Sequence, residues 1–278
     1  ARSFVNSAGL HADDVSQMLG VGGGKIYACR GEYFVLDKRL DGSLKTLLYP
    51  VPKPKDPGLG IHLTPTVDGN ILIGPSADYI SGDREDYMTT AAVMESLRRE
   101  ARRLLPSLAD GDYIRNFSGN RPKTTPPDTG GNADFIIDEP RPGFIRLQGI
   151  ESPGFTSAPA IAEKVRDLIS SRIPLREKET RVAAREGFAE RFAELSMEMK
   201  AELARSDPDY GETVCRCEGV TKREVRDAIE NPLGVRTLKG IKYRSRAMMG
   251  RCQGGFCLSR IARMLREDYG RDIFDYMR

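Results

Sequence analysis

The sequence lacks three features that mark easily recognised classes of protein. No apolar run reaches the roughly 20 residues that a membrane-spanning helix requires. The opening residues, ARSFVNSAGL, lack the basic start and long apolar stretch of a secretory signal peptide. The formal net charge is only +3, which argues against nucleic-acid binding by overall charge. These absences predict a cytoplasmic protein with no transmembrane segment and no nucleic-acid partner.

Cysteine is scarce as well, but four of the five cysteines are grouped. They form a C-x-C pair, a gap of 34 residues and then a C-x-x-x-x-C pair, at Cys215, Cys217, Cys252 and Cys257. Without a secretory signal, thiols more often hold metal than form disulfides. Four thiolates complete a [2Fe–2S] cluster with two on each iron. Zinc is the alternative, although structural zinc sites usually carry C-x-x-C pairs.

The sequence around these cysteines predicts helices that support a metal site. Thr221-x-x-Glu224 is a capping box, which starts a helix directly after the first pair. A second helix is expected to begin at Cys257, with its positive N-terminal end toward the cluster. Its apolar stripe is expected at Leu258, Ile261, Ala262 and Leu265.

The rest of the chain divides into a mixed α/β part and a charged connector. Short apolar runs between Pro and Gly turns predict strands at 33–36, 46–51, 60–64, 71–73, 135–137 and 144–147. One helix is predicted over 86–105, with Val93, Leu97, Ala101 and Leu104 on its apolar face, and a second after the loop 149–154. Residues 176–210 are highly charged and predicted to be a helical linker. SFVNSAGLHADDV reads as a strand, a turn and a helix, so the sequence is expected to begin inside a larger protein.

The C-terminal motifs resemble a known family. CRCEGVTKREVRDAI and TLKGIKYRSRAMMGRCQGGFC are similar to the bacterioferritin-associated-ferredoxin-like [2Fe–2S] domain over about residues 211–263. The resemblance implies that all four grouped cysteines are cluster ligands. It leaves two interpretations for the neighbouring basic residues, which either tune the cluster and meet an acidic partner or are plain solvated charges. These residues include Arg216, Lys239, Lys242 and Arg251.

The first part of the chain resembles a second family. NSAGLHADD, GIHLTPTVDGNILIGPSAD, SGNRPKT and GIESPGFTSAPAIAEKV are similar to segments of the D-amino-acid-oxidase-like (DAO family) flavoproteins, in their glycerol-3-phosphate and L-2-hydroxyglutarate dehydrogenase branch. An appended cluster domain is similar to the large subunit of anaerobic glycerol-3-phosphate dehydrogenases. The resemblance implies an α+β fold. A mixed or antiparallel substrate-domain sheet at about 20–147 is expected beside remnants of an FAD-binding α/β domain at 1–19 and 148–175. The linker 176–210 and a small helical [2Fe–2S] domain at 211–278 then follow.

This second resemblance implies roles for particular residues. Arg121 would grip a substrate carboxylate or phosphate with two hydrogen bonds, and His62 would accept the hydroxyl proton or hold the substrate. A loop at a helix N-terminus would contact the flavin and stabilise its anionic reduced form, through Gly149, Ile150, Glu151, Ser152, Pro153 and Gly154. The plain alternatives are a surface arginine, a structural histidine and a simple Gly/Pro turn. Cys29 is interpreted as a small apolar residue, and Lys53 and Lys55 as part of a proline-rich solvated loop.

One departure from the flavoprotein pattern stands out. The G-x-G-x-x-G that binds the FAD pyrophosphate is absent, because the glycines of Gly20-Val-Gly22-Gly23-Gly24-Lys25 are wrongly spaced and follow no apolar strand. The FAD site of this chain is therefore expected to be incomplete.

The combined patterns predict part of an FAD-dependent dehydrogenase of a small anionic hydroxy compound. Glycerol-3-phosphate or a 2-hydroxy acid would be the substrate. Electrons would pass through the [2Fe–2S] cluster to an acceptor subunit or a quinone, which allows peripheral association with the inner face of the membrane. The alternatives are a non-catalytic electron-transfer or docking module, a structural zinc protein and, within the enzymes, an amino-acid oxidase.

Overall fold

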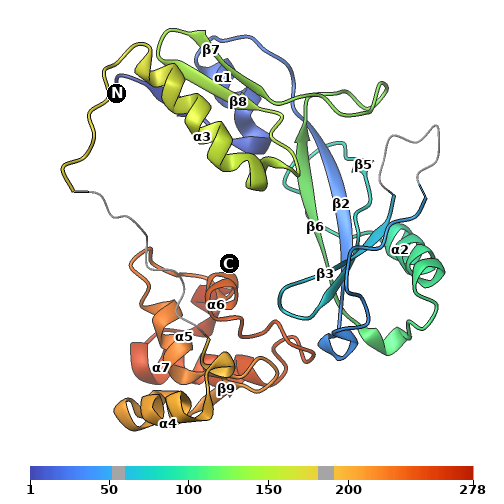
Figure 1. The fold of residues 1–278 in the computed structure, drawn as a ribbon, viewed down its shortest axis with the longest axis vertical. Coiled ribbons are helices and arrows are strands. Elements are labelled where there is room, and N and C mark those ends of the chain that lie inside the picture. The colour runs from blue at the N-terminus through green and yellow to red at the C-terminus, as the bar shows by residue number, and fades with distance from the viewer. Residues whose placement is uncertain (52–59, 181–190, 278) are drawn as a thin grey trace. The chain divides into compact units, whose positions relative to one another are not determined.

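The computed structural model describes residues 1–51, 60–180 and 191–277, and the chain divides into two compact units (Figure 1). The first unit comprises Ala1–Leu36 and Leu40–Glu179, and the second comprises Asp37–Arg39 and Thr180–Arg278. Lys53 and Lys55 of the predicted proline-rich loop lie outside the described residues.

The first unit contains a small three-stranded sheet. Strand β8 (Phe144–Gln148) lies between β1 (Phe4–Asn6), which pairs with it in parallel, and β7 (Ile136–Arg141), which pairs with it antiparallel. Helices α1 (Ala12–Met18) and α3 (Gly154–Ser170) accompany this sheet. The buried side chain of Asn6 fixes α1 to β1, because its amide donates to the Ala12 carbonyl oxygen at 2.8 Å and to Ser16 Oγ at 3.2 Å.

A larger antiparallel sheet occupies the rest of the first unit. Its strands run in the order β3-β4-β2-β5, and β6 also pairs with β2. Their bounds are β2 Tyr27–Leu36, β3 His62–Pro65, β4 Ile71–Gly74, β5 Asp78–Tyr79 and β6 Tyr113–Lys123. The antiparallel sheet beside a small mixed one confirms the predicted α+β fold class.

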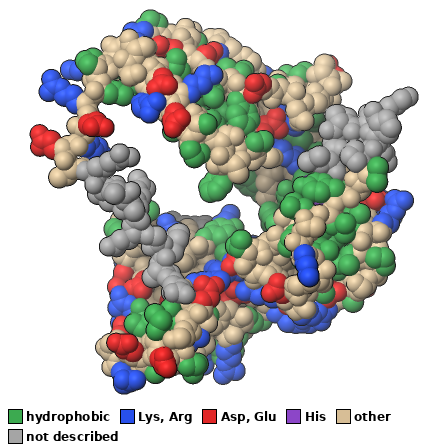
Figure 2. Space-filling model, in the orientation of Figure 1, with side chains coloured by type: hydrophobic (Ala, Val, Ile, Leu, Met, Phe, Trp, Pro, Cys, Tyr) green, Lys and Arg blue, Asp and Glu red, His purple; other side chains and the backbone are tan. Residues whose placement is uncertain are grey.

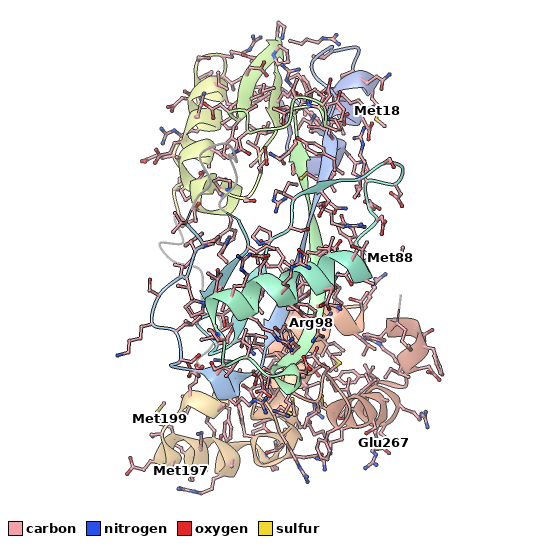
Figure 3. All side chains as sticks on the ribbon, turned by 90° about the vertical axis from the view of Figure 1, so that its right-hand side faces the viewer. Met18, Met88, Arg98, Met197, Met199 and Glu267 are labelled. Atoms are coloured by element: carbon pink, nitrogen blue, oxygen red, sulfur yellow. The ribbon has the colours of Figure 1, made fainter. Side chains whose placement is uncertain are left out.

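Helix α2 (Ala91–Leu104) packs on the larger sheet and closes its core. Leu97 and Ala101 are fully buried there with Leu36 and Leu63. At the edge of this core the guanidinium carbon of Arg98 lies 4.9 Å and 4.4 Å from the ring centroids of Phe34 and Tyr113 (Figure 3). The rings are therefore covered by a cation that stays partly in water.

Two predictions for this unit were wrong in detail. Residues 46–51 form no strand, and only an isolated bridge joins Leu48 to Leu63. The predicted helix 86–105 begins at Ala91, and Met94 is buried on its inner face while Val93 and Leu104 are only half-buried. The late start has a long-range cause, because Glu32 accepts hydrogen bonds from the Thr90 backbone N–H at 2.7 Å and from its hydroxyl at 3.0 Å.

The second unit is a small helical domain with one short hairpin. Its main elements are α4 Met197–Ser206, β9 Thr213–Cys215, β10 Val220–Thr221, α5 Lys222–Ile229, α6 Leu238–Ser245 and α7 Cys257–Tyr269. Short 3-10 turns occur at Phe192–Glu194, Pro208–Gly211 and Ile273–Tyr276. Within the predicted helical linker 176–210, α-helix is found at Met197–Ser206. Residues 176–178 have no regular structure, and residues 181–190 are outside the described part.

The core of the second unit forms around α7. Cys257, Ile261, Met264 and Leu265 are buried at the i, i+4, i+7 and i+8 positions of this helix. The predicted stripe was wrong at Leu258, which is 36% exposed, because the buried Cys257 side chain sets which face of the helix points inward. Over the residues described, no helix is long and apolar enough to cross a bilayer.

Removing the carboxylate of Glu32 is expected to destabilise the first unit. Glu32 is fully buried, lies 3.3 Å from Arg30 Nε and holds the start of α2. Glu32→Ala would leave a buried guanidinium without this partner, so the free energy of unfolding should fall by about 3 kcal/mol. Urea denaturation followed by circular dichroism measures this loss. Glu95→Ala on the exposed face of α2 is the control, and equal effects of the two substitutions would contradict the prediction.

Candidate functional site

The four grouped cysteines come together in the second unit as two pairs. Cys217 and Cys252 are exposed, with their Sγ atoms 3.6 Å apart. Cys215, at the end of β9, and Cys257, at the start of α7, are buried and joined by a hydrogen bond between their thiols. Each pair therefore takes one cysteine from each of the two sequence motifs.

Hydrogen bonds to sulfur favour the thiolate form that binds metal. Hydrogen bonds to its sulfur lower the pKa of Cys215 to about 6 against the effect of burial. The thiol of Cys257 is the largest cause, and the backbone N–H groups of Met248, Glu218 and Cys217 contribute less. The same thiol–thiol bond raises the pKa of its donor, Cys257. The backbone N–H of Phe256 is the largest cause of the lowered pKa of Cys252. These donors would equally stabilise ligand sulfurs around a cluster.

The pairing also bears on which metal the cysteines suit. Nowhere in residues 1–51, 60–180 and 191–277 do three or more His, Cys, Asp or Glu side chains gather around one metal position. Structural zinc needs four ligands around one ion, whereas a [2Fe–2S] cluster takes two thiolates on each of two irons. The two thiol pairs match the two-plus-two ligand set of a [2Fe–2S] cluster, and zinc stays the alternative.

The loop between α6 and α7 is bent sharply to present these groups. Met248 and Gln253 have φ angles of +68° and +47°, which are uncommon for residues with a side chain. Gly250 is required by space, because a Cβ atom there would lie 2.1 Å from Cys217 Cβ. Backbone held in sparsely populated conformations is typical of ligand-binding segments. The motif spacing gave no sign of the positive φ at Met248.

In the first unit, the predicted flavin loop 149–154 leads from β8 into α3. Gly149 has a φ of +70°, and a Cβ there would lie 3.0 Å from Thr124 Cγ2. Helix α3 begins at Gly154 with no side chain capping its N-terminus. Its first backbone N–H groups thus form the kind of uncapped helix end that favours an anion.

A buried ion pair connects this loop to β6. Lys123 Nζ lies 3.1 Å from a carboxylate oxygen of Glu151, and it donates to the Gly131 carbonyl oxygen at 2.8 Å and to Asn132 Oδ1 at 2.9 Å. Residues two apart on a strand share a face, so Arg121 lies on the same face of β6 as Lys123. The contact between β6 and the loop 149–154 is thus made by Lys123, which the sequence analysis did not single out.

Arg121 is a cation that the protein leaves without a counter-charge. Its Nη2 donates to the Ser76 carbonyl oxygen at 2.8 Å and its Nη1 to Cys29 Sγ at 3.5 Å. None of the described carboxylates forms an ion pair with it, unlike the neighbouring Arg30 and Lys123. A guanidinium that is fixed and half-buried, yet unpaired, is suited to binding an anion.

Three further residues surround Arg121. Cys29 is its direct cross-strand neighbour, so the plain apolar interpretation of this cysteine missed its position. A Cβ at Gly31 would lie 2.6 Å from Arg121 Nη2, so a larger residue there would displace the guanidinium. Burial raises the pKa of Tyr33, and the Arg121 guanidinium opposes this rise. Only the pairing register of β2 with β6, which a single sequence does not reveal, assembles this group.

His62 stands apart from Arg121. It is on β3, which β4 separates from β2, and its ring stacks on Tyr49 with centroids 4.4 Å apart. Its Nδ1 lies 3.0 Å from the Gly60 carbonyl oxygen. A carbonyl can only accept, so this contact is a hydrogen bond in the tautomer that carries a proton on Nδ1. The role of His62 as proton acceptor stays a prediction.

Replacing one exposed cysteine is expected to abolish cluster assembly. Cys217→Ser would leave Cys252 without its partner, so iron and acid-labile sulfide should fall from about two of each per chain to near zero. Cys29→Ser is the matched control and should keep the full amount. Elemental analysis and visible absorption after anaerobic reconstitution measure both. Zinc in place of iron, or an intact cluster in Cys217→Ser, would contradict the assignment.

Similarity to known proteins covers both parts of the chain. Residues 1–168 match the family described as FAD dependent oxidoreductase, and residues 213–267 match the BFD-like [2Fe-2S] binding domain. A glycerol 3-phosphate dehydrogenase from Caloramator mitchellensis is 38% identical over 271 residues, covering 97% of this chain and 55% of that protein. A mitochondrial L-2-hydroxyglutarate dehydrogenase from Arabidopsis thaliana is 34% identical over 177 residues, covering 58% of this chain and 36% of that protein.

A solved structure adds support for the first unit. The L-alpha-glycerophosphate oxidase from Mycoplasma pneumoniae with FAD bound aligns with a TM-score of 0.55 at 28% identity, covering 64% of this chain and 44% of that one. The chain thus spans about half the length, or less, of the relatives it matches. With its first 168 residues matched, the chain belongs to the FAD dependent oxidoreductase family, and a BFD-like [2Fe-2S] binding domain follows in the same polypeptide.

Proposed function

We propose that the intact protein is an FAD-dependent dehydrogenase of a small anionic hydroxy compound, either glycerol-3-phosphate or a 2-hydroxy acid. The observation that carries this proposal is Arg121, a guanidinium with no ion pair to a described carboxylate, on the same strand as Lys123, which pairs with Glu151 of the loop 149–154. The similarity to a glycerol 3-phosphate dehydrogenase and an L-2-hydroxyglutarate dehydrogenase supports the same substrate class.

Arg121 would orient the substrate through its anionic group. The hydrogen bond to the Ser76 carbonyl oxygen fixes the guanidinium plane, and the remaining N–H groups can donate to a carboxylate or phosphate. Fixing the anion would limit the directions in which the substrate's C–H bond can point. Tyr33 lies beside the same guanidinium and would exclude water from that side.

The loop 149–154 and the start of α3 would hold the redox end of FAD. When bound, FAD supplies a two-electron acceptor that takes a hydride at its N5 atom. The uncapped N-terminus of α3 would stabilise the negative charge of the reduced form. The hydroxyl proton needs a base, and His62 Nε2 is our proposal for it.

The four cysteines would provide the exit for electrons. A [2Fe–2S] cluster held by the pairs Cys215/Cys257 and Cys217/Cys252 carries one electron at a time. The acceptor would be another subunit or a quinone. We place the protein in the cytoplasm, and a quinone acceptor would require peripheral association with the inner face of the membrane.

Several features of the first unit support an incomplete FAD site in this chain. Helix α3 buries none of its residues, and apolar side chains lie on its surface (Figure 2). A cavity of about 450 Å³ between β1 and α3 is lined by apolar side chains that include Val5, Ile150 and Val165. An additional layer of protein would cover these surfaces in the longer relatives.

The glycine-rich segment 20–24 does not replace the missing phosphate loop. Arg146 Nη1 donates to the Gly22 carbonyl oxygen at 3.0 Å, and Gln148 Nε2 donates to the Gly24 carbonyl oxygen at 2.6 Å. The carbonyl oxygens of this segment are therefore used to tie it to β8. A pyrophosphate site instead requires N–H groups at the start of a helix directly after a strand.

The isolated chain is expected to purify without flavin. Flavin fluorescence after acid release should be near zero for residues 1–278. A protein extended upstream by a dinucleotide-binding region should release about one FAD per chain, since that region would supply the pyrophosphate contacts. Iron content serves as the internal control for folding of the second unit. One tightly held FAD in the isolated chain would refute the incomplete site.

Substitution of Arg121 tests the substrate site in the intact protein. Arg121→Lys keeps the charge but loses the planar pair of donors, so kcat/KM for glycerol-3-phosphate or 2-hydroxyglutarate should fall by about 10²- to 10³-fold. FAD content should stay unchanged. Arg99→Lys, at an exposed position of α2, is the matched control. Equal kcat/KM in Arg121→Lys and the control would rule out Arg121 as the substrate anchor.

A further inference from the structure

The surface beside the exposed cysteines carries arginines arranged around one aromatic ring. The guanidinium carbons of Arg216 and Arg260 lie 4.2 Å and 4.6 Å from the ring centroid of Phe256. Arg216 stands between the ligands Cys215 and Cys217. Phe256 directly precedes Cys257, and its backbone N–H is donated to Cys252. The ring and its two cations are thus built into the segments that hold the cluster.

These arginines lack counter-charges, unlike several other arginines of the same unit. Among the described residues, no carboxylate forms an ion pair with Arg216, Arg260 or Arg263, the last of which is exposed one helical turn after Arg260. On α5, by contrast, Arg223 pairs with Asp207 and Asp227 at 3.4 Å and 2.6 Å. Arginines without a carboxylate partner therefore lie directly beside the cluster ligands.

The sequence shows the same imbalance. Residues 211–278 contain 15 Lys and Arg against 9 Asp and Glu, whereas the whole chain contains 43 against 40. The remaining 210 residues therefore carry an excess of acidic groups. A surplus of cations confined to one small domain is an asymmetry that can steer a partner of opposite charge.

The two thiol pairs differ in how closely a partner can approach them. Cys217 and Cys252 are exposed, while Cys215 and Cys257 are buried. Electron transfer between proteins slows steeply with distance, so a partner gains most by contacting the surface around the exposed pair. That surface is the one that carries Phe256 and the unpaired arginines.

We propose that Arg216, Phe256, Arg260 and Arg263, here called the arginine surface, dock an acidic protein that accepts single electrons. Carboxylates of the partner would pair with the guanidiniums, and Phe256 would supply a flat apolar contact at the centre. One electron would leave the reduced cluster and reduce the partner's redox group by one electron, with no proton transferred. The proposal rests on the proposed role of the cluster as the electron exit.

Salt dependence of electron transfer from the reconstituted full chain tests the arginine surface. Two haem proteins serve as acceptors in stopped-flow mixing with the dithionite-reduced chain, acidic cytochrome b5 and basic cytochrome c. Between 20 and 500 mM NaCl the rate constant with cytochrome b5 should fall on the order of tenfold, because salt screens the attraction. The rate constant with cytochrome c should rise or stay level. The same fall with both acceptors, or no fall with cytochrome b5, would overturn the proposal.

Neutral variants then locate the effect. Arg216→Gln/Arg263→Gln should lower the low-salt rate constant with cytochrome b5 by roughly three- to tenfold, and the difference should vanish at high salt. Arg266→Gln is the matched control, since Arg266 is exposed in the last turn of the same helix α7. An unchanged EPR spectrum and midpoint potential show that the cluster is intact in each variant. An equal loss in Arg266→Gln would contradict the assigned surface.

A binding measurement separates this proposal from the proposed function. If the chain assembles no reducible cluster, the electron-exit role fails, but the dissociation constant for cytochrome b5 still tests docking. That constant should rise at least threefold in Arg216→Gln/Arg263→Gln and stay the same in Arg266→Gln. Arginine-dependent binding to phosphatidylglycerol vesicles or single-stranded DNA, without binding to cytochrome b5, would overturn the proposal in favour of a lipid or nucleic-acid surface.

Discussion

The buried ion pair of Lys123 with Glu151 is the interaction on which the candidate substrate site depends. It joins two sheets of different pairing, because Lys123 ends β6 of the antiparallel sheet and Glu151 follows β8 of the mixed one. A charge pair this deeply buried persists only when further hydrogen bonds satisfy it, and Gly131 and Asn132 supply them to the lysine. The strand that carries Arg121 is tied to the loop before Gly154 as a result.

In both units, the arginines and lysines that pair with a carboxylate differ in their proposed role from those that have none. Arg30 and Lys123 pair with the carboxylates of Glu32 and Glu151, and Arg223 pairs with Asp227 of α5 and with Asp207 after α4. Arg121 is held by a carbonyl oxygen instead, and Arg216 by an aromatic ring, so that each keeps its full positive charge. Among the described residues, no carboxylate pairs with Arg121 or Arg216, the positions where an anion or an acidic partner is expected.

Local patterns predicted what depends on neighbours in sequence. The capping box at Thr221 and Glu224 gives α5, and the cysteine spacing gives the metal ligands with their helix at Cys257. The start of α2 was misplaced because it depends on Glu32, 58 residues away from Thr90. The group of Cys29, Gly31 and Tyr33 around Arg121 depends on strand register, and the need for glycine at position 250 depends on its close approach to Cys217. None of these has a signature in one sequence.

Each thiol pair takes one cysteine from each motif, and this arrangement also affects the stability of the second unit. A cluster held by all four cysteines would join residues 215–217 to residues 252–257 and so close a chain loop of more than thirty residues. Closing such a loop restricts the unfolded chain and links folding to metal binding. The cluster would then stabilise the fold of this unit as well as carry electrons. The lifetime of this domain in a cell would follow the supply of iron and sulfide.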